Sequence, residues 1–239
     1  MEKQALLYQG KAKRVYATNE ENVVWLEYTD QATAFNGEKK ADIQGKGVLN
    51  NEITSLLFMK LQEKGIPSHF IKKISEREHL AKKVSIIPLE VVVRNVAAGS
   101  MSKRLGIEEG TALKHPIVEF YYKNDDLGDP LITEAHIDLL EIATADELQE
   151  ITEKALKVNE VLTAFFAGIN IRLIDYKLEF GKTETGDILL ADEISPDTCR
   201  LWDSRTGEKL DKDVFRRDLG NITDAYEQIL TRLGGTQNV

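Results

Sequence analysis

Charged residues occupy alternate positions in the apolar stretch LIDYKLEFGK, residues 173–182. If the stretch is a strand, Asp175, Lys177 and Glu179 point to one face and the apolar side chains point to the other. An ammonium group between two carboxylates on an apolar strand suggests a site that binds a cation or neutralises charge during a reaction. The alternative is a solvated outer face, where the three charges meet only water.

The turn TETGD at 183–187 predicts a β-hairpin that brings another carboxylate to this face. With Thr185 and Gly186 at the centre of the turn, the register places Asp192 opposite Glu179. Two carboxylates whose Cβ atoms lie about 5 Å apart repel each other by roughly 3 kcal/mol. A divalent cation between them removes the repulsion, and oxygen ligands favour Mg²⁺ completed by phosphate oxygens. A register shift of one residue would break the pairing.

The stretch YQGKAKRVY at 8–16 predicts a tight basic turn between two strands. Gly10 allows the backbone to approach a ligand closely, while Lys11 and Lys13 supply positive charge. A strand–loop–strand flap of this kind covers nucleotide phosphates in kinase-like folds. The spacing is not that of a Walker A loop, and an ordinary basic hairpin turn is the alternative.

The stretch RNVAAGSMSKR at 94–104 predicts a phosphate site at the end of a buried strand. Small residues after Arg94 let the chain turn, and Ser100 can cap a short helix. A helix start binds phosphate through backbone N–H groups, and an arginine adds a bidentate contact. Glu90 lies on the same strand face as Arg94, so an internal ion pair between them is the structural alternative.

The stretch DEISPDTCRLWD at 192–203 directly follows the hairpin and predicts a turn at Ser195-Pro196-Asp197. From beyond this turn, Arg200 can reach back toward Asp175, although an ordinary polar loop explains the pattern equally well. Cys199 has no base beside it and is predicted to be a packed thiol.

These stretches require particular elements to position them. The patterns predict short strands within 4–28, a helix over 46–64, a buried strand over 84–94, a short helix over 100–105, a helix over 145–167, a hairpin of 171–180 with 187–194, and a last helix over 213–233. Thr144 and Glu147 form a capping-box pattern, and Gly168 is predicted to be the C′ residue of the same helix. The order of elements predicts an α+β protein with a smaller N-terminal part, residues 1–85, and a larger part, residues 86–239.

The composition excludes several classes of protein. The chain has 239 residues, 42% of them hydrophobic, with a net charge of −9 and a pI near 5.1. A nucleic-acid partner is not expected because nucleic-acid binders are normally basic. One cysteine and four scattered histidines predict neither an internal disulfide nor a zinc cluster. No signal-peptide pattern and no apolar run of about 20 residues are present, so we expect a cytoplasmic protein without a membrane span.

The chemical stretches together resemble the SAICAR synthetase family of purine biosynthesis. IIPLEVVVRNVAAGS at 86–100 and LIDYKLEFG at 173–181 look like the two long signatures of this family. GKAKRVY near the start and DEISPDTCRLWD in the last quarter stand in the order and spacing of the family. DQATAFNG at 30–37 is similar to its early acidic loop.

The resemblance implies a two-lobed ATP-grasp-like fold with antiparallel sheets and an ATP cleft between the lobes. The implied reaction joins L-aspartate to the carboxylate of carboxyaminoimidazole ribotide (CAIR), with ATP converted to ADP and phosphate through an acyl phosphate. It also implies Mg²⁺ and a homodimer. Another ATP-dependent carboxylate–amine ligase, a small-molecule kinase and a non-catalytic nucleotide-binding module are the alternatives.

By the resemblance, each candidate residue has a role. The ATP-binding residues would be Lys11, Ala12, Lys13, Lys82 and Ile86. The Mg²⁺ ligands would be Glu179 and Asp192. The residues at the ribotide phosphate would be Arg94, Ser100 and Arg200, and the residues at the reacting imidazole and its carboxylate would be Lys177, Glu90 and Asp175. Lys123 and Asp129, in the loop 119–136, would close over the substrate.

Overall fold

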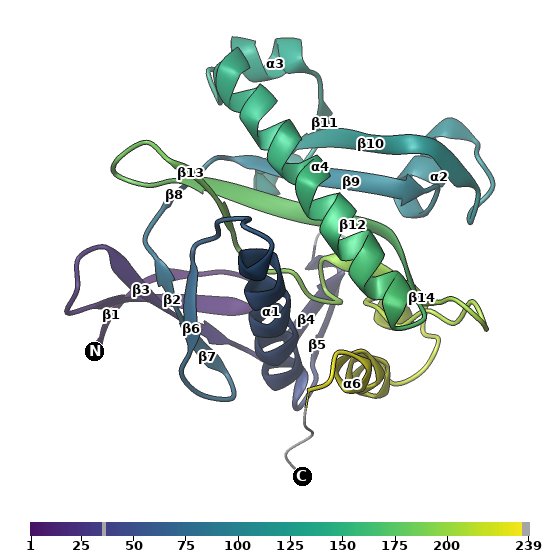
Figure 1. Cartoon of the computed structure of the whole chain (residues 1–239), viewed down its shortest axis with the longest axis horizontal. Helices are drawn as coiled ribbons and strands as arrows, with labels where there is room; N and C mark the ends of the chain where they lie inside the picture. The colour runs from purple at the N-terminus through teal and green to yellow at the C-terminus, as the bar shows by residue number, and fades with distance from the viewer. Residues whose placement is uncertain (35–36, 236–239) are drawn as a thin grey trace.

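The computed structural model describes residues 1–34 and 37–235 and has an α+β architecture built on antiparallel sheets (Figure 1). The predicted fold class is therefore confirmed. Phe35 and Asn36, which belong to the acidic loop DQATAFNG, and residues 236–239 lie outside the described residues.

The N-terminal part of the chain forms a five-stranded sheet with the order β1-β2-β3-β7-β6. Its strands are β1 (Lys3–Gln9), β2 (Lys13–Thr18), β3 (Val23–Tyr28), β6 (Phe70–Lys73) and β7 (Glu78–Lys82). A separate pair joins β4 (Gln31–Ala34) to β5 (Lys39–Asp42). The predicted short strands within 4–28 are confirmed as β1, β2 and β3, and the basic turn lies between β1 and β2.

The larger sheet is organised around one long strand, β12 (Ile171–Lys182). Its order is β11-β10-β9-β12-β13, and β8 and β14 also pair with β12. The remaining strands are β8 (Ser85–Ile86), β9 (Leu89–Val96), β10 (Ala112–Tyr122), β11 (Leu131–Ile132), β13 (Ile188–Ala191) and β14 (Cys199–Asp203). β12 pairs with β9 and β14 along its first part and with β13 and β8 along its end, so its charged residues lie at the centre of the sheet.

The single strand predicted over 84–94 is two strands, β8 and β9. Pro88 separates them and has no N–H group to donate to a ladder. The two strands meet different parts of β12: Ile86 is opposite Gly181, whereas Val91 is opposite Leu178.

Six α-helices and one 3₁₀ turn complete the described residues. They are α1 (Lys46–Glu63), α2 (Gly99–Leu105), η2 (Asp125–Leu127), α3 (Glu134–Leu139), α4 (Ala145–Gly168), α5 (Asp213–Arg216) and α6 (Ile222–Arg232). The predicted capping box is present at α4, where Thr144 Oγ1 accepts from the Glu147 N–H and the Glu147 carboxylate accepts from the Thr144 N–H. α4 crosses the large sheet over β12 (Figure 1).

Two helix predictions were wrong in detail. Gly168 is the last helical residue of α4, and the left-handed conformation falls on Asn170, at φ 58°. The helix predicted over 213–233 is interrupted between α5 and α6, where Asn221 caps α6 by accepting from the Thr223 N–H. An asparagine favours a new helix start over continuation because its side chain satisfies a free backbone donor.

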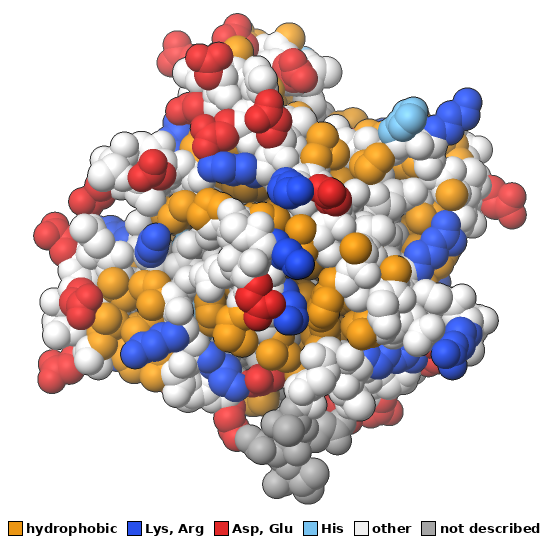
Figure 2. Space-filling model, viewed as in Figure 1, with side chains coloured by type: hydrophobic (Ala, Val, Ile, Leu, Met, Phe, Trp, Pro, Cys, Tyr) orange, Lys and Arg blue, Asp and Glu red, His pale blue; other side chains and the backbone are white. Residues whose placement is uncertain are grey.

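One hydrophobic core spans both parts of the chain. Side chains of α1, including Ile53, Leu57 and Phe58, belong to the same buried cluster as side chains of β12, α4 and α6. The chain passes from the five-stranded sheet to the large sheet between Lys82 and Ser85, but one hydrophobic cluster contains side chains from both sides of this point. The division into lobes at residues 85 and 86 therefore stays a prediction. On the outer surface, Figure 2 shows acidic side chains gathered at the end of the molecule where α3 and the start of α4 lie in Figure 1.

Candidate active site

Every predicted site residue lines one cavity of about 1010 Å³. The predicted residues that line it are Lys11, Ala12, Lys13, Lys82, Ile86, Glu90, Arg94, Ser100, Lys123, Asp129, Asp175, Lys177, Glu179, Asp192 and Arg200. They come from the five-stranded sheet, the large sheet and the loops between them. The cavity establishes that these side chains are neighbours, while their individual roles stay predictions.

The predicted register of the hairpin β12–β13 was wrong by one residue. Glu179 pairs with Ala191, not with Asp192. The cause is a longer turn, in which the Thr183 N–H donates to the Asp187 carbonyl at 3.0 Å. Asp192 directly follows β13 with φ 58°, and its carboxylate still lies close to that of Glu179 because both contact Lys177.

Lys177 lies among three carboxylates. Its Nζ is 2.6 Å from Glu179 Oε1, 3.2 Å from Glu90 Oε1 and 3.7 Å from Asp192 Oδ2. Burial disfavours the charged form of this lysine, but the charges of Glu179 and Asp192 outweigh it and raise the pKa of Lys177 well above its ordinary value. The ammonium group is therefore fixed in place and charged at neutral pH.

Two further lysines approach the same carboxylates from outside β12. Lys13 of β2 pairs with Asp192 and lies 3.1 Å from Glu193 Oε1, while Lys123 Nζ is 2.9 Å from Glu179 Oε1. Burial raises the pKa of Asp192, but the charges of Lys13 and then Lys177 outweigh it and hold that pKa well below its ordinary value. The result is an alternating cluster of ammonium groups and ionised carboxylates.

The donor set of this cluster fits a magnesium–phosphate complex. Glu179 and Asp192 offer carboxylate oxygens, and Mg²⁺ is usually held by one or two carboxylates with phosphate oxygens and water completing the octahedron. Among residues 1–34 and 37–235, no group of three or more His, Cys, Asp or Glu side chains forms an all-protein metal cage. The lysines are placed to pair with the remaining phosphate charge.

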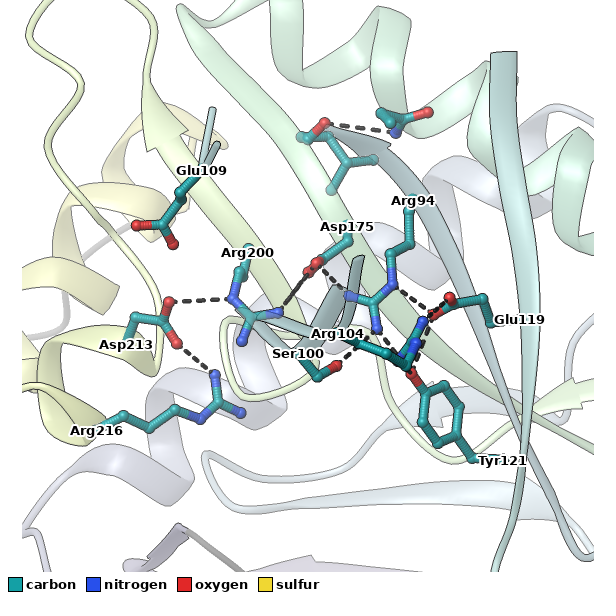
Figure 3. Close-up of polar contacts among 12 residues, drawn as sticks. Arg94, Ser100, Arg104, Glu109, Glu119, Tyr121, Asp175, Arg200, Asp213 and Arg216 are labelled. Carbon is teal, nitrogen blue, oxygen red and sulfur yellow. Dashed lines mark hydrogen bonds and ion pairs between the residues drawn. The ribbon is translucent and has the colours of Figure 1, made fainter. Parts of the chain in front are cut away.

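A second polar network lies at the other end of the cavity (Figure 3). Arg94 donates to Glu119 and to Asp175, each at 2.7 Å, to Ser100 Oγ at 3.2 Å and to the Tyr121 hydroxyl at 3.0 Å. The alternative Glu90–Arg94 ion pair is not formed, because Glu90 contacts Lys177 and Arg94 is engaged by other carboxylates.

Arg200, on β14, reaches Asp175 on the neighbouring strand β12, as its position after the turn suggested. It donates to Asp175 at 3.0 Å and to Asp213 at 3.0 Å, and Arg216 holds the other oxygen of Asp213 at 2.8 Å. Gly99, at φ 56°, makes this approach possible, because a Cβ there would lie 2.5 Å from Arg200 Nη2. Arginine and carboxylate thus alternate along this end, a pattern suited to binding an anion.

An apolar wall lies beside the lysine cluster. Val15, Val24 and Leu26 of the five-stranded sheet line the cavity together with Ile86 and Pro88. Val24 and Leu26 belong to a small buried cluster of that sheet, so the wall is a rigid surface. Its shape and chemistry suit the face of a flat aromatic base.

The loop before β11 closes one side of the cavity. Lys11 and Asp125 form an exposed ion pair at 2.7 Å across the opening. The Asp129 carboxylate accepts from the Asn124 N–H at 2.9 Å. Asp129 therefore stabilises the conformation of this loop.

Sequence reasoning missed several cavity-lining residues. Glu193 follows Asp192 in the stretch 192–203 and lines the cavity. A second charge directly after a buried strand was a signal that could have predicted this residue. His69, Lys212 and Arg216 also line the cavity, but no motif marks them. Burial lowers the pKa of His69 to about 4 and also lowers the pKa of Lys212, whose Nζ is 3.6 Å from Asp197. Cys199 is buried as predicted, and burial raises the pKa of its thiol.

Comparisons with known proteins agree on one family. The model of the SAICAR synthetase family matches residues 6–233. The phosphoribosylaminoimidazole-succinocarboxamide synthase of Anoxybacillus flavithermus is 67% identical over 235 residues, which are 98% of each chain. The crystal structure of the synthase from Ehrlichia chaffeensis is 49% identical, with a TM-score of 0.95 over 98% of this chain and 100% of that one. A SAICAR synthetase solved in complex with ADP is 50% identical, with a TM-score of 0.94 over 97% of this chain and 99% of that one.

Within the described residues, no helix is long and apolar enough to cross a bilayer.

Proposed function

The chain belongs to the SAICAR synthetase family, and we infer its reaction from that membership and from the two ends of the cavity. It is an ATP-dependent carbon–nitrogen ligase that joins L-aspartate to the carboxylate of CAIR. The products are SAICAR, ADP and phosphate, in purine biosynthesis. Its fold is that of the solved SAICAR synthetases.

The assignment of the two ends is supported by one observation: the cavity holds two separate networks of basic and acidic side chains. The lysine–carboxylate cluster lies beside an apolar wall, which suits the phosphates and base of a nucleotide. In the arginine network, Arg94 and Arg200 both donate to Asp175. This network suits a second phosphate, on another substrate. The ADP complex of a relative supports nucleotide binding by this chain.

At the nucleotide end, Lys11, Lys13 and the backbone at Ala12 bind the ATP phosphates, and Lys82 with the backbone near Ile86 contacts the adenine side. Glu179 and Asp192 would hold Mg²⁺, which would neutralise phosphate charge. In the structure Lys13 pairs with Asp192 and Lys177 pairs with Glu179, so both lysines would be available to phosphate oxygens once a cation neutralised these carboxylates.

At the ribotide end, Arg200 and Ser100 bind the phosphate of CAIR, and Arg94 fixes the carboxylates around it. Arg94 is 3% exposed and already pairs with Glu119 and Asp175, so its planar fork also sets the shape of the pocket. Lys123 and Asp129 lie on the segment that closes over the bound substrates.

The reaction takes place between these ends, at Lys177. A carboxylate oxygen of CAIR attacks the γ-phosphorus of ATP, and ADP leaves. The amine of L-aspartate then attacks the acyl carbon, loses a proton, and phosphate leaves. Lys177 neutralises charge on the transferred group, while Glu90 and Asp175 orient the imidazole and its neighbours. Such a transfer needs positioning and charge neutralisation and no protein nucleophile.

The first test is ADP release by the purified protein with MgATP, CAIR and L-aspartate, with each component omitted in turn. We expect turnover only in the complete mixture and an aspartate adduct as product. ATP consumption without aspartate would instead indicate a kinase-like reaction or a different amine. Binding of ATP without consumption in any mixture would indicate a non-catalytic nucleotide-binding module.

A homodimer is part of the proposal and follows from the family resemblance. Light scattering tests it, since a dimer has twice the chain mass of 26.9 kDa.

A further inference from the structure

Asp192 has an unusual backbone conformation for a residue with a side chain. It follows β13 directly and has φ 58°, in the left-handed region that residues other than glycine rarely adopt. Conformations of this kind persist when the surrounding contacts hold them, and they are concentrated at functional sites. Its carboxylate faces the lysine cluster, so the contacts that hold this backbone bear on the site.

Around Asp192, the backbone carbonyl of every second residue accepts a hydrogen bond from the N-terminal part of the chain. The carbonyl of Leu190 accepts from the His69 N–H at 2.8 Å, and the carbonyl of Asp192 contacts His69 Nε2 at 3.2 Å. The carbonyl of Ile194 accepts from Thr54 Oγ1 at 3.1 Å. His69 therefore holds the segment at two points, one on each side of the left-handed turn.

The His69 ring is itself fixed by packing. It is 4% exposed and lies edge-on to Phe58, with ring centroids 5.6 Å apart, and 6.2 Å from the ring of His79. Because a carbonyl oxygen is only an acceptor, Nε2 must carry the proton in this contact. A buried ring whose N–H is bonded to a backbone carbonyl positions that backbone.

We propose that His69 is a positioning residue: its Nε2–H group holds the backbone of Asp192 in the left-handed conformation that turns the Asp192 carboxylate toward Lys177 and Glu179. The inference rests on the proposed role of Asp192 as a Mg²⁺ ligand. Groups that orient ligating side chains commonly change metal affinity or activity by about 10- to 100-fold when they are removed.

The test compares three variants of the full chain by calorimetric titration of ADP with and without Mg²⁺. His69→Phe keeps an aromatic ring and removes the donor, whereas His69→Gln keeps an N–H group at similar reach. His79→Phe is the matched control, because His79 belongs to the same aromatic cluster but contacts Asn51 at 2.9 Å. The ratio of ADP affinities with and without Mg²⁺ is the readout.

We expect His69→Phe to reduce that ratio by about 10-fold or more while ADP affinity without Mg²⁺ stays within about twofold. His69→Gln should retain most of the ratio, and His79→Phe should retain it even if its melting temperature falls. A wild-type ratio in His69→Phe would overturn the inference, as would equal losses in the phenylalanine and glutamine variants.

Two measurements separate this inference from the proposed function. Asp192→Asn serves as the reference: if it leaves the Mg²⁺ effect unchanged, the metal role of Asp192 is wrong, whereas a loss in Asp192→Asn without one in His69→Phe removes only the inference about His69. In the unaltered protein, ¹⁵N spectra of the imidazole nitrogens give the tautomer. An Nδ1–H tautomer at His69 would overturn the inference even if no variant folds, and an Nε2–H tautomer supports it.

Discussion

At the scale of single residues, the cavity is defined by charges that neutralise one another. Lys177 contacts three carboxylates, and Lys13 and Lys123 pair with two of them from other elements. Such a cluster is stable without a ligand because each buried charge has a partner. The same pairs suit the binding of a ligand. A phosphate can take the place of a carboxylate beside each lysine, and a cation can take the place of a lysine beside each carboxylate.

Replacing Asp192 by asparagine should remove a proposed metal ligand and leave the fold in place. We expect kcat at saturating MgATP to fall by about 100-fold or more, because charge neutralisation at the transferred phosphate is lost. Turnover and circular dichroism measure the two effects. The matched control is Glu184→Gln, in the exposed turn of the same hairpin, which should behave like the unaltered protein. Near-normal turnover of Asp192→Asn would remove the metal assignment.

Replacing Arg94 by lysine keeps the charge and removes the planar fork. The structure has Arg94 donating to four side chains, and one ammonium group cannot reproduce that geometry. We expect the KM for CAIR to rise by about 10-fold or more and the free energy of unfolding to fall by about 1–3 kcal/mol. Steady-state kinetics and urea unfolding measure these quantities. Unchanged CAIR kinetics with lowered stability would mean that Arg94 is purely structural.

At the scale of elements, β12 is the strand on which the site depends. It pairs with β14 and then β13 along one edge, and with β9 and then β8 along the other from Asp175 onward. Its partners change near Glu179, between the two polar networks of the cavity. Strand β14 brings Arg200 directly to the Asp175 carboxylate. The short helix α2 brings Ser100 to Arg94, which also contacts Asp175. Small changes in these elements should therefore alter substrate binding.

Gly99→Ala should disturb the ribotide end through the start of α2. The added Cβ would lie 2.5 Å from Arg200 Nη2, and φ 56° is strained for alanine. We expect a higher KM for CAIR and a free energy of unfolding lower by about 1 kcal/mol or more. Gly168→Ala is the control, because nothing lies within 4 Å of a Cβ at the helical Gly168, so it should be neutral or slightly stabilising. Unchanged CAIR kinetics in Gly99→Ala would contradict the role given to this close approach.

Asp211, between β14 and α5, should make stability depend on pH. Burial, followed by the charge of Asp213, raises its pKa from 3.8 to about 7. A carboxyl whose pKa is higher in the folded state binds more protons there than in the unfolded state, so the free energy of unfolding should fall as pH rises between about 4 and 7. One such group contributes a slope of up to about 1.4 kcal/mol per pH unit.

Urea unfolding from pH 5 to pH 8 measures this slope in the unaltered protein and in Asp211→Asn. The variant should lose the contribution, even though its overall stability falls because Asp211 accepts the N–H groups of Leu201 and Asp213. The same slope in both proteins would exclude Asp211 as its source.

At the scale of the whole molecule, ion pairs join residues of the N-terminal part of the chain to residues of the larger part. Lys13 pairs with Asp192, and the fully buried Lys46 pairs with Asp197 at 2.6 Å. A third pair, Lys11–Asp125, is exposed and spans the opening of the cavity. The first two pairs fix the arrangement, whereas the exposed pair contributes little to stability. In the proposed role of Lys11, this exposed pair would compete with a nucleotide for the lysine.

Asp125→Ala should therefore strengthen nucleotide binding slightly. Removing the competing carboxylate frees Lys11, and exposed pairs are worth about 0.2–1 kcal/mol, so we expect the Kd for MgADP to fall by up to about fivefold. Titration at two salt concentrations checks this, since the difference should shrink at high salt. Asp126→Ala, next to it in the same exposed turn, is the control. Weaker binding in Asp125→Ala would mean that Asp125 contacts the nucleotide complex itself.

Local patterns in the chain were enough to predict the fold class, most elements and the neighbours within each motif. Alternation placed Asp175, Lys177 and Glu179 on one face of β12, and the capping box placed the start of α4, because both patterns depend only on local backbone geometry. The long signatures also indicated the family. These properties are local, so they can be read without knowing what packs against them.

The hairpin register and the partner of each charge became known only from the folded structure, whereas Asn221 was a local signal for the break between α5 and α6. The register depended on a turn one residue longer than the predicted one, and Asp192 nevertheless met Lys177 through a left-handed backbone. Residues such as His69 and Lys212 carry no motif, since they reach the cavity from distant elements. Contacts between segments far apart in the chain depend on how whole sheets and helices pack, and no local pattern contains that information.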